Sequence, residues 1–305
     1  MAEAEELLYL AAACEELDEL ECAVVAVEAA KESVEPTDYK DRRFDLTQLS
    51  NTECCNYFRF NKADIYRLEE ALRLPARLVS PTRVTADRTA ALCLLLRRLM
   101  YPNRLNDLLP LLGRSVSELS IIFNCILDHI HDNFGHLLGN LHQPWLSLEK
   151  LNTFAQAVAN KGALHQNCWG FIDGTTMAIS KPKQHQKVVF SGHKRIHCLK
   201  FQGIMTPNGL FAHMFGPMEG RRHDAAMFHE SGIMTTLEET MNRPDSTPLC
   251  LYGDPAYPLR PHEMKPFMGA RLTREQEEFN KDMSSVRISV EWGFGKISNL
   301  FAFVD

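Results

Sequence analysis

The spacing of apolar residues changes near Gly162, and this change constrains the fold more than any other feature of the sequence. Residues 57–160 follow a helical period, with apolar side chains three and four positions apart. After Gly162, short apolar runs bounded by turn residues predict strands at 168–172, 196–205, 210–215 and 249–252. Helices are expected at about 224–241 and from 284 or 285 to about 297. We therefore expect an α/β protein, in which a helical region precedes a mixed sheet flanked by helices.

Charge is distributed unevenly along the chain. Residues 1–35 carry eleven acids and one base, a balance of −10, so the net charge of −6 leaves +4 on residues 36–305. Apolar residues of this acidic arm follow a helical seam from Leu10 to Val27. Such a helix could dock on its own protein, bind a partner helix or lie over a basic surface. We expect the acidic amphipathic arm at 1–35, a linker at 36–56, a helical region at 57–160 and a strand-rich domain at 161–305.

Several protein classes do not fit this composition. The longest apolar runs, at 7–14 and 90–96, are far shorter than the ~20 residues that cross a bilayer, so no membrane association is expected. The first residues are acidic, which fits neither a secretory signal nor a transit peptide. Nine cysteines include no C-x-x-C pair, and we expect most of them to be buried reduced thiols.

The helical region contains a candidate DNA-reading motif. A helix is expected from Asn61 to Leu74 and another over about 85–100. A short helix over 105–112 is followed by Gly113, and Ser115 with Glu118 then forms a capping box that opens the next helix. This order is typical of a helix-turn-helix, although small helical bundles use the same turn. The candidate DNA-binding residues here are Arg97, Arg98, Arg104, Arg114, Ser117, Ser120 and Asn124.

Three carboxylates occur where elements of the strand-rich domain are expected to end or pack. Asp173 follows an apolar strand and precedes Gly174, and Asp254 follows another such strand and Gly253. Glu291 lies at the border of the apolar face of the last helix. The alternative interpretations are ordinary Asp-Gly turns and, for Glu291, a surface ion pair with Arg287 one turn earlier.

Carboxylates brought together repel one another unless a cation lies between them. Several hard oxygen ligands favour Mg²⁺ or Mn²⁺ over zinc. Two such ions about 3.5–4 Å apart can activate a water or a 3′-hydroxyl and stabilise the leaving oxygen of a phosphodiester. If the three acids converge, the sequence therefore suggests a phosphodiester-cleaving site that uses two ions of Mg²⁺ or Mn²⁺.

A family resemblance rests on five sequence blocks. In chain order they are CWGFIDGT, GHKRIHCLKFQGIMTPNGL, GPMEGRRHDAAMFHESG, LCLYGDPAYPL and FNKDMSSVRISVEWGFGKI. They resemble the nuclease domain of the PIF/Harbinger group of DDE transposases and the nucleases domesticated from them. The resemblance runs over residues 165–300, and the helical region is also similar. It implies an RNase H-like fold with Asp173, Asp254 and Glu291 as the catalytic and metal-binding triad, holding two Mg²⁺ or Mn²⁺.

The resemblance also implies roles for residues between the first two acids. Bases between Lys181 and Lys200, with Arg221 and Arg222, would neutralise DNA phosphates near the site, and an exposed basic face is the alternative. His223 and Asp224 match a paired block of the family, and they would either orient a metal ligand from outside the coordination shell or cap a helix. The candidate DNA-binding residues of this domain are Lys194, Arg195, Lys200, Arg221 and Arg222.

The function that the resemblance implies is cleavage of transposon ends and transfer of the freed 3′-OH to target DNA. Members of the family are expected to act in the nucleus with a separate Myb-like DNA-binding partner and to remain in the cytoplasm without it. A homo-oligomer is the expected assembly. Family members continue well past the glutamate helix, so a truncated C-terminal part is expected here. The alternatives are a domesticated DNA-binding or scaffold protein without cleavage and a general metal-dependent nuclease.

Overall fold

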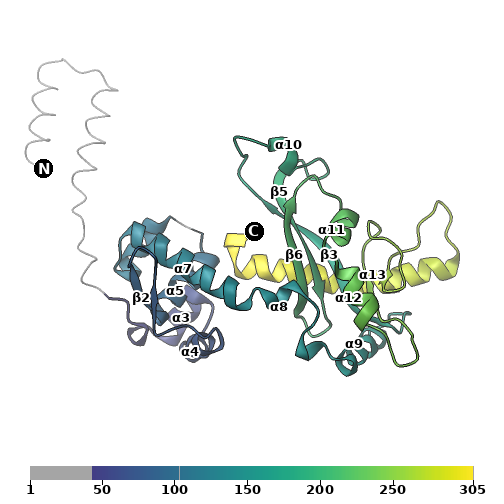
Figure 1. The fold of residues 1–305 in the computed structure, drawn as a ribbon, viewed down its shortest axis with the longest axis horizontal. Coiled ribbons are helices and arrows are strands. Elements are labelled where there is room, and N and C mark those ends of the chain that lie inside the picture. The colour runs from purple at the N-terminus through teal and green to yellow at the C-terminus, as the bar shows by residue number, and fades with distance from the viewer. Residues whose placement is uncertain (1–42, 103, 305) are drawn as a thin grey trace, which may run out of the picture. The chain divides into compact units, whose positions relative to one another are not determined.

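The computed structural model describes residues 43–102 and 104–304, and the expected acidic arm lies outside these residues. Figure 1 shows the helical elements at the N-terminal side of the described chain and the sheet after them. The first elements are η2 (Leu46–Gln48), α3 (Asn51–Phe58), α4 (Lys62–Ala71), β1 (Arg77–Val79), β2 (Thr85–Asp87) and α5 (Arg88–Met100). They are followed by η3 (Leu105–Leu108), α6 (Leu109–Leu112), α7 (Val116–Phe134), α8 (His136–Gly139), η4 (Pro144–Leu146) and α9 (Leu148–Asn160).

Side-chain caps fix the starts of most of these helices. Asn61 accepts a hydrogen bond from the backbone of Asp64 and begins α4, as its sequence position indicates. Ser115 and Glu118 form the expected capping box at α7, with Ser115 N donating to Glu118 Oε2 over 3.0 Å. Gly113 ends α6 in the left-handed conformation, at φ +62°. The short helix, glycine turn and capped helix predicted from the sequence are therefore present.

Two stretches differ from the sequence expectation. Residues 51–58, of which most fall in the expected linker, form α3, because Ser50 and Glu53 make a capping box and Cys54 is buried. The helix expected over 85–100 begins only at Arg88, since residues 85–87 pair with β1 as an antiparallel strand. Asp87 then caps α5. Helix α3 therefore begins within the range 36–56 that the sequence suggested as a linker.

The remaining elements form a mixed sheet with helices. They are β3 (Cys168–Ala178), α10 (Gln186–Val189), β4 (Phe190–Ser191), β5 (Ile196–Met205), β6 (Phe211–Glu219), α11 (Asp224–Glu230), α12 (Ile233–Thr240), β7 (Cys250–Tyr252), β8 (Glu263–Met264), α13 (Arg274–Leu300) and η5 (Ala302–Val304). The strand order is β4-β5-β3-β7-β8, and β6 pairs with β5. Strands β3, β7 and β8 are parallel to one another, whereas β5 is antiparallel to β3 and to β6.

Apolar clusters on either side of this sheet tie helices to it. Trp169 and Ile172 of β3 pack with residues of α9, α11 and α12. Phe171, between them in the chain, belongs to a second cluster that includes Met283 and Val290 of α13. The successive side chains of Phe171 and Ile172 point to opposite faces, so β3 is covered by helices on both sides. The register shift between Cys168 and Gly170 allows Trp169 to lie on the same side as Ile172. The expected mixed sheet flanked by helices is confirmed.

Strand β3 and helix α13 are both longer than the sequence suggested. β3 continues through Gly174 to Ala178, because residues 171–178 pair with β5. Asp173 therefore lies within a strand, and the turn expected at Gly174 is absent. Helix α13 begins at Arg274 rather than at 284 or 285, since Thr273 and Gln276 form a capping box. The helix expected over 224–241 is divided into α11 and α12 at Gly232, which has φ +64°.

Helix hydropathy and the state of the cysteines can both be described for the residues of the structure. Among the described residues no single helix is long and apolar enough to span a membrane. The helices at 105–112 and 116–134, which are bent relative to each other, meet these two criteria only when they are taken together. The seven cysteines in the described part of the chain are free, and Cys54, Cys93, Cys168, Cys198 and Cys250 are buried.

Candidate active site

Asp173 and Asp254 lie side by side because of the register of two parallel strands. Phe171 of β3 pairs with Tyr252 of β7, and each aspartate is two residues further along its chain. Asp173 is mostly buried, with 17% of its side chain exposed, and its Oδ1 accepts a hydrogen bond from Gly174 N over 2.9 Å. Asp254 follows β7, and its Oδ1 accepts a hydrogen bond from Ala256 N over 2.9 Å. The structure thus brings the first two predicted acids together where β7 ends beside the middle of β3.

Glu291 reaches the same region through Arg287, which lies one turn earlier on α13. Arg287 donates from Nη1 to Asp173 Oδ2 over 3.2 Å and from Nη2 to Glu291 Oε1 over 2.7 Å. The expected helical ion pair between Arg287 and Glu291 is therefore present, but the same guanidinium also binds Asp173, 114 residues away in sequence. Glu291 faces the aspartate edge rather than the far side of its helix.

The pKa values of the two aspartates are raised in this site. Burial raises the pKa of Asp173 from 3.8 to about 6; Arg287 and the Gly174 amide oppose this rise, and the charges of Asp254 and Glu291 add to it. Burial also raises the pKa of Asp254, and the charge of Asp224 contributes to that rise. Two desolvated aspartates with only part of their charge balanced favour a cation between them.

Carboxylate oxygens are the donors that Mg²⁺ and Mn²⁺ prefer, so the donor chemistry of these acids fits such an ion. In the described residues no three acids, histidines or cysteines are grouped as a metal site. The Arg287 guanidinium lies between Asp173 and Glu291 and supplies part of the balancing charge. A divalent cation held by all three acids would take over a role that Arg287 fills in this structure.

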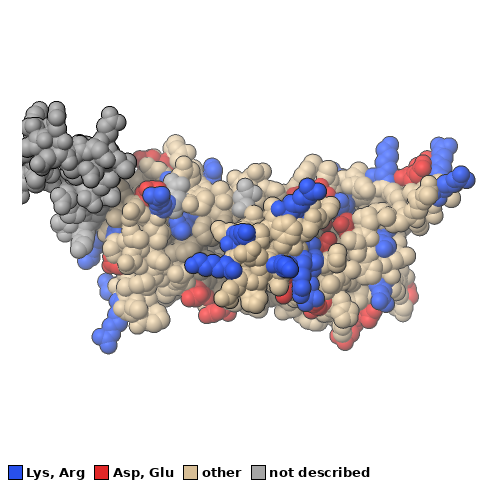
Figure 2. Space-filling model, turned by 90° about the horizontal axis from the view of Figure 1, so that it is seen from above, with Lys and Arg blue, Asp and Glu red and all other residues tan. Residues whose placement is uncertain are grey.

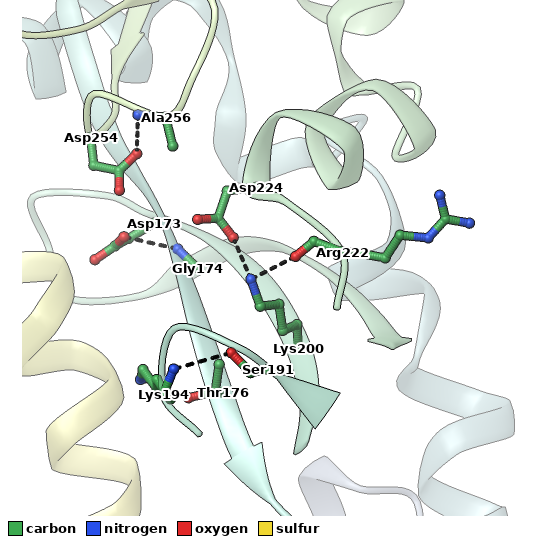
Figure 3. A network of polar contacts seen from close by, with 10 residues as sticks. All are labelled: Asp173, Gly174, Thr176, Ser191, Lys194, Lys200, Arg222, Asp224, Asp254 and Ala256. Carbon is green, nitrogen blue, oxygen red and sulfur yellow. Dashed lines mark hydrogen bonds and ion pairs between the residues drawn. The ribbon is translucent and has the colours of Figure 1, made fainter. Parts of the chain in front are cut away.

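A fourth carboxylate, Asp224 at the start of α11, lies next to these acids (Figure 3). A Cβ added to Gly174 would come within 3.1 Å of Asp224 Oδ1, so the glycine leaves room for this side chain. Lys200 Nζ lies 3.4 Å from Asp224 Oδ1 and donates to the carbonyl oxygen of Arg222 over 2.7 Å. His223 is exposed at the N-cap of α11, and its side chain makes no capping hydrogen bond.

The predicted DNA-binding bases of this domain divide into exposed and engaged residues. Arg195 and Arg221 are exposed, as are Lys181, Lys183 and Lys187. Lys194 is exposed and donates to Thr176 Oγ1 over 2.7 Å. Lys200 is largely buried, and Arg222 pairs with Glu219 and Glu230. Figure 2 shows Lys and Arg side chains at several places on the face that it presents, with Asp and Glu side chains among them.

The predicted bases of the helical region are found in two kinds of surroundings. Arg97 stacks on the rings of Tyr57 and Tyr101, and Arg98 stacks on Phe123 and Phe303, so both pack against aromatic side chains. Arg114 lies 3.6 Å from Glu118 in a helical ion pair. Exposed residues of the candidate motif are Arg104, Ser117 and Asn124, with Ser120 half-buried.

Sequence reasoning missed two features of this site. The bond from Arg287 to Asp173 joins distant parts of the chain, and the i, i+4 spacing pointed only to the local partner. Gly174 was read as a turn residue, whereas its lack of a side chain makes room for Asp224. The Arg-Ile-Ser-Val-Glu spacing on an amphipathic helix was the available signal for Arg287, since it places both charges on the same border of the apolar face.

Comparisons with known proteins give a family match and similar relatives. Residues 172–305 match a family described as DDE superfamily endonuclease. A probable transposase for insertion sequence element IS702 from Microchaete diplosiphon is 30% identical over 127 residues, which cover 39% of this chain and 42% of that protein. A protein described as ALP1-like from Arabidopsis thaliana is 25% identical over 150 residues, covering 46% of this chain and 37% of its own length.

The chain therefore spans less than half the length of these two relatives. No solved structure matches the chain. The range that matches the family begins one residue before Asp173 and contains Asp254 and Glu291. Residues 172–305 are thus similar to DDE superfamily endonucleases, and the similarity to a transposase agrees with the Harbinger-type resemblance of the sequence.

Proposed function

We propose that the protein is a metal-dependent DNA endonuclease and strand transferase of the Harbinger type, with Asp173, Asp254 and Glu291 as its catalytic acids. The observation that carries the proposal is the meeting of the middle of β3, the turn after β7 and helix α13. Arg287 links Asp173 to Glu291 there, and strand register places Asp254 beside Asp173. The mixed sheet with helices on both faces is compatible with the RNase H-like fold that such enzymes use.

The three acids would hold Mg²⁺ or Mn²⁺, which supplies activation of a water or 3′-hydroxyl and stabilisation of the leaving oxygen. Asp173 and Asp254 are held by hydrogen bonds from the Gly174 and Ala256 amides, which fixes the direction of one oxygen of each. Glu291, with 47% of its side chain exposed, borders solvent and so is accessible to a DNA strand. Arg287 balances the charge of Asp173 and Glu291 when no other cation is present.

The DNA interface would include the exposed bases between the first two acids. Lys194 and Arg195 lie on the turn that joins β4 to β5, and Arg221 follows β6. Their charges would attract phosphates and make binding salt-dependent. Lys200 and Arg222 contribute charge to the same region, although each is already paired with an acid. His223 is exposed next to Asp224 and would contact the strand or a bridging water.

The helical region would contribute a second DNA contact. In the helix-turn-helix order of α6, Gly113 and α7, Arg114 lies just before α7, Ser117 lies on its first turn and Asn124 lies two turns further on. In helix-turn-helix proteins these turns meet the base edges of the major groove. Arg104 would add a phosphate contact, whereas Arg97 and Arg98 would act mainly through packing on aromatic rings.

A second candidate function is DNA binding without cleavage, as in a domesticated scaffold protein. The observation that favours it is the Arg287 guanidinium, which balances Asp173 and Glu291 without a metal. A protein that has lost cleavage would keep this ion pair in the presence of Mg²⁺. The two functions therefore differ in whether the acids respond to a divalent cation.

The testing experiment is DNA cleavage by the full chain with Mg²⁺ or Mn²⁺. Duplexes carrying the DNA that flanks the gene are compared with a supercoiled plasmid of unrelated sequence. Nicking of the flanking duplexes that Asp173→Asn, Asp254→Asn and Glu291→Gln each abolish supports the transposase. Equal cutting of both substrates indicates a general nuclease, and binding without metal-dependent cutting indicates the scaffold.

The proposal extends to the setting of the reaction. By the family resemblance, the protein would act in the nucleus, would need a Myb-like DNA-binding partner and would form homo-oligomers on DNA ends. Imaging of the tagged chain with and without a co-expressed Myb-like protein tests the first two points. Accumulation in the nucleus without any partner would contradict the expected dependence.

A further inference from the structure

We propose that Trp292 stacks on an unpaired base of the DNA strand whose phosphodiester lies at Glu291, and that Gly295 leaves open the helix surface on which this base lies. The inference rests on the proposed function, because it takes DNA as the ligand of this domain. It adds a binding site for a nucleobase on the solvent-facing side of α13, which is separate from the acids and from the exposed bases between them.

The first argument is the exposure of Trp292. The chain has three tryptophans, of which Trp169 is fully buried, Trp145 is half-buried and Trp292 is 69% exposed. No large apolar side chain in the described part of the chain is more exposed. Ile288, one turn earlier on α13, is 42% exposed, so the apolar surface continues along this side of the helix. An indole ring held in water beside a second apolar side chain is typical of a binding surface.

The second argument is the position of Trp292 beside the candidate active site. It follows Glu291 directly on α13, and Glu291 shares the Arg287 guanidinium with Asp173. Successive side chains of a helix point about 100° apart around its axis, so the indole ring lies next to the outer side of Glu291. Lys296 is exposed one turn after Trp292. A strand whose phosphate meets Glu291 would therefore have its bases near the ring and a further phosphate near the lysine.

The third argument concerns Gly295 and does not depend on the ring. Gly295 lies inside α13, one turn after Glu291 and three residues after Trp292, so it borders both side chains. Glycine inside a helix lowers the stability of the helix. At Gly293 packing explains the glycine, since a Cβ there would lie 2.5 Å from Met205 Sδ. A Cβ on Gly295 would meet nothing within 4 Å among the described residues, so the close approach of a ligand to the backbone is the better explanation.

A nucleobase is the occupant that fits these three features together. Bases stack on exposed aromatic side chains whatever their sequence, because every base has a flat π-face. The open surface at Gly295 admits a flat ring beside the indole, and Lys296 supplies the positive charge that a DNA strand requires. A protein partner is the competing occupant, and it would cover Trp292 without any DNA.

The test measures binding of the full chain to a labelled oligothymidylate by fluorescence anisotropy in EDTA, so that no metal is required. A strand of abasic sugars carries the same phosphates without bases. We expect Trp292→Ala to weaken oligothymidylate binding about fivefold or more and to leave binding of the abasic strand unchanged. Trp292→Phe keeps a ring and should retain most of the affinity. The matched control is Met268→Ala, which removes a side chain that is 67% exposed before α13 begins and should bind both strands as the parent does.

Two further readouts separate stacking from a structural effect. Oligothymidylate should quench the tryptophan emission of the parent, whereas the abasic strand should not, and Trp292→Phe should show no such quenching. Gly295→Leu places a side chain on the open surface, so its affinity for oligothymidylate should fall as in Trp292→Ala. Its melting temperature should equal or exceed that of the parent, because leucine favours the helix and meets no neighbour there.

The outcomes distinguish this inference from the proposed function. Loss of base-dependent binding in Trp292→Ala and in Gly295→Leu, at unchanged melting temperature, supports the inference. Parent-like binding by either variant, or an equal loss for both strands, contradicts it. If Trp292→Ala changes only the oligomeric state of the chain in sedimentation without DNA, the surface is a protein interface and the inference is wrong. A chain that cleaves DNA while Trp292→Ala binds as the parent refutes the inference alone, and a chain that binds bases through Trp292 without cleaving refutes the proposed cleavage alone.

Discussion

Replacing Asp173 by Asn should stabilise the protein at neutral and alkaline pH. Burial and the neighbouring acids raise the pKa of Asp173 to about 6, against 3.8 for the free side chain. Between these values the folded state binds more protons than the unfolded state, so the free energy of unfolding falls as pH rises. Above pH 6 the ionised aspartate lowers the free energy of unfolding. Asn cannot ionise, so a protein with Asn at this position does not lose this stability.

The magnitude follows from the difference of about 2.2 pKa units at ~1.36 kcal/mol each, which gives about 3 kcal/mol. Only 17% of the Asp173 side chain is exposed, so solvent screening reduces this figure little. Asp173→Asn should therefore be up to about 3 kcal/mol more stable than the parent at pH 8. At pH 4, where the folded parent is protonated at this position, the two proteins should have nearly equal stability.

Urea unfolding followed by circular dichroism at pH 4, 6 and 8 in EDTA measures this difference. The control is Asp132→Asn, which changes an acid with 76% of its side chain exposed on α7 and should shift stability by less than about 0.5 kcal/mol. A difference between parent and Asp173→Asn that is the same at pH 4 and pH 8 would refute the reasoning. A loss of stability at pH 8 would refute it as well.

Three further predictions test single contacts of the site and its sheet. Tyr257→Phe removes a buried hydroxyl without a partner, so its melting temperature should equal or exceed that of the parent. Gly203→Ala should lower the free energy of unfolding by about 1–3 kcal/mol, because the new Cβ meets two phenylalanine rings within 3 Å, whereas Gly192→Ala, with no atom within 4 Å, should have little effect. Arg287→Met should raise the pKa of Asp173 above about 6, seen as an upward shift in ¹³C carboxyl titrations; an unchanged pKa would show that the ion pair is not formed in solution.

Local signals in the sequence predicted the parts of the fold that depend on local contacts. The caps at Asn61 and Ser115 act on backbone groups three residues away, and both helices begin where these residues place them. Asp254 follows an apolar strand and a glycine, and it lies after β7 as expected. The same kind of signal at Ser50 and Thr273 was overlooked, which explains the missed α3 and the late start of α13.

Features that depend on pairing between distant segments could not be predicted. Gly174 after Asp173 has the composition of a turn, but pairing of β3 with β5 carries the strand past it to Ala178. The spacing from Arg287 to Glu291 predicts a helical ion pair. The bond from Arg287 to Asp173, however, depends on how α13 packs on the sheet. The acids of the site were therefore predicted one by one, while their connection through Arg287 required the structure.

The approach of Asp224 illustrates the same limit. Its neighbour Gly174 is 50 residues earlier in the chain, and only the placement of α11 against the sheet brings the two together. The His-Asp pair at 223 and 224 pointed to a role near the metal or at a helix start. The structure places His223 at the N-cap and Asp224 beside the other acids.

The central claim is that Asp173, Asp254 and Glu291 act together in cutting DNA. The most direct measurement is Mg²⁺-dependent nicking of duplexes that carry the DNA flanking the gene, comparing the parent with Glu291→Gln under conditions where both proteins bind the duplex equally. The account predicts nicking by the parent that EDTA abolishes and no detectable nicking by Glu291→Gln. Nicking by Glu291→Gln at the rate of the parent would contradict it.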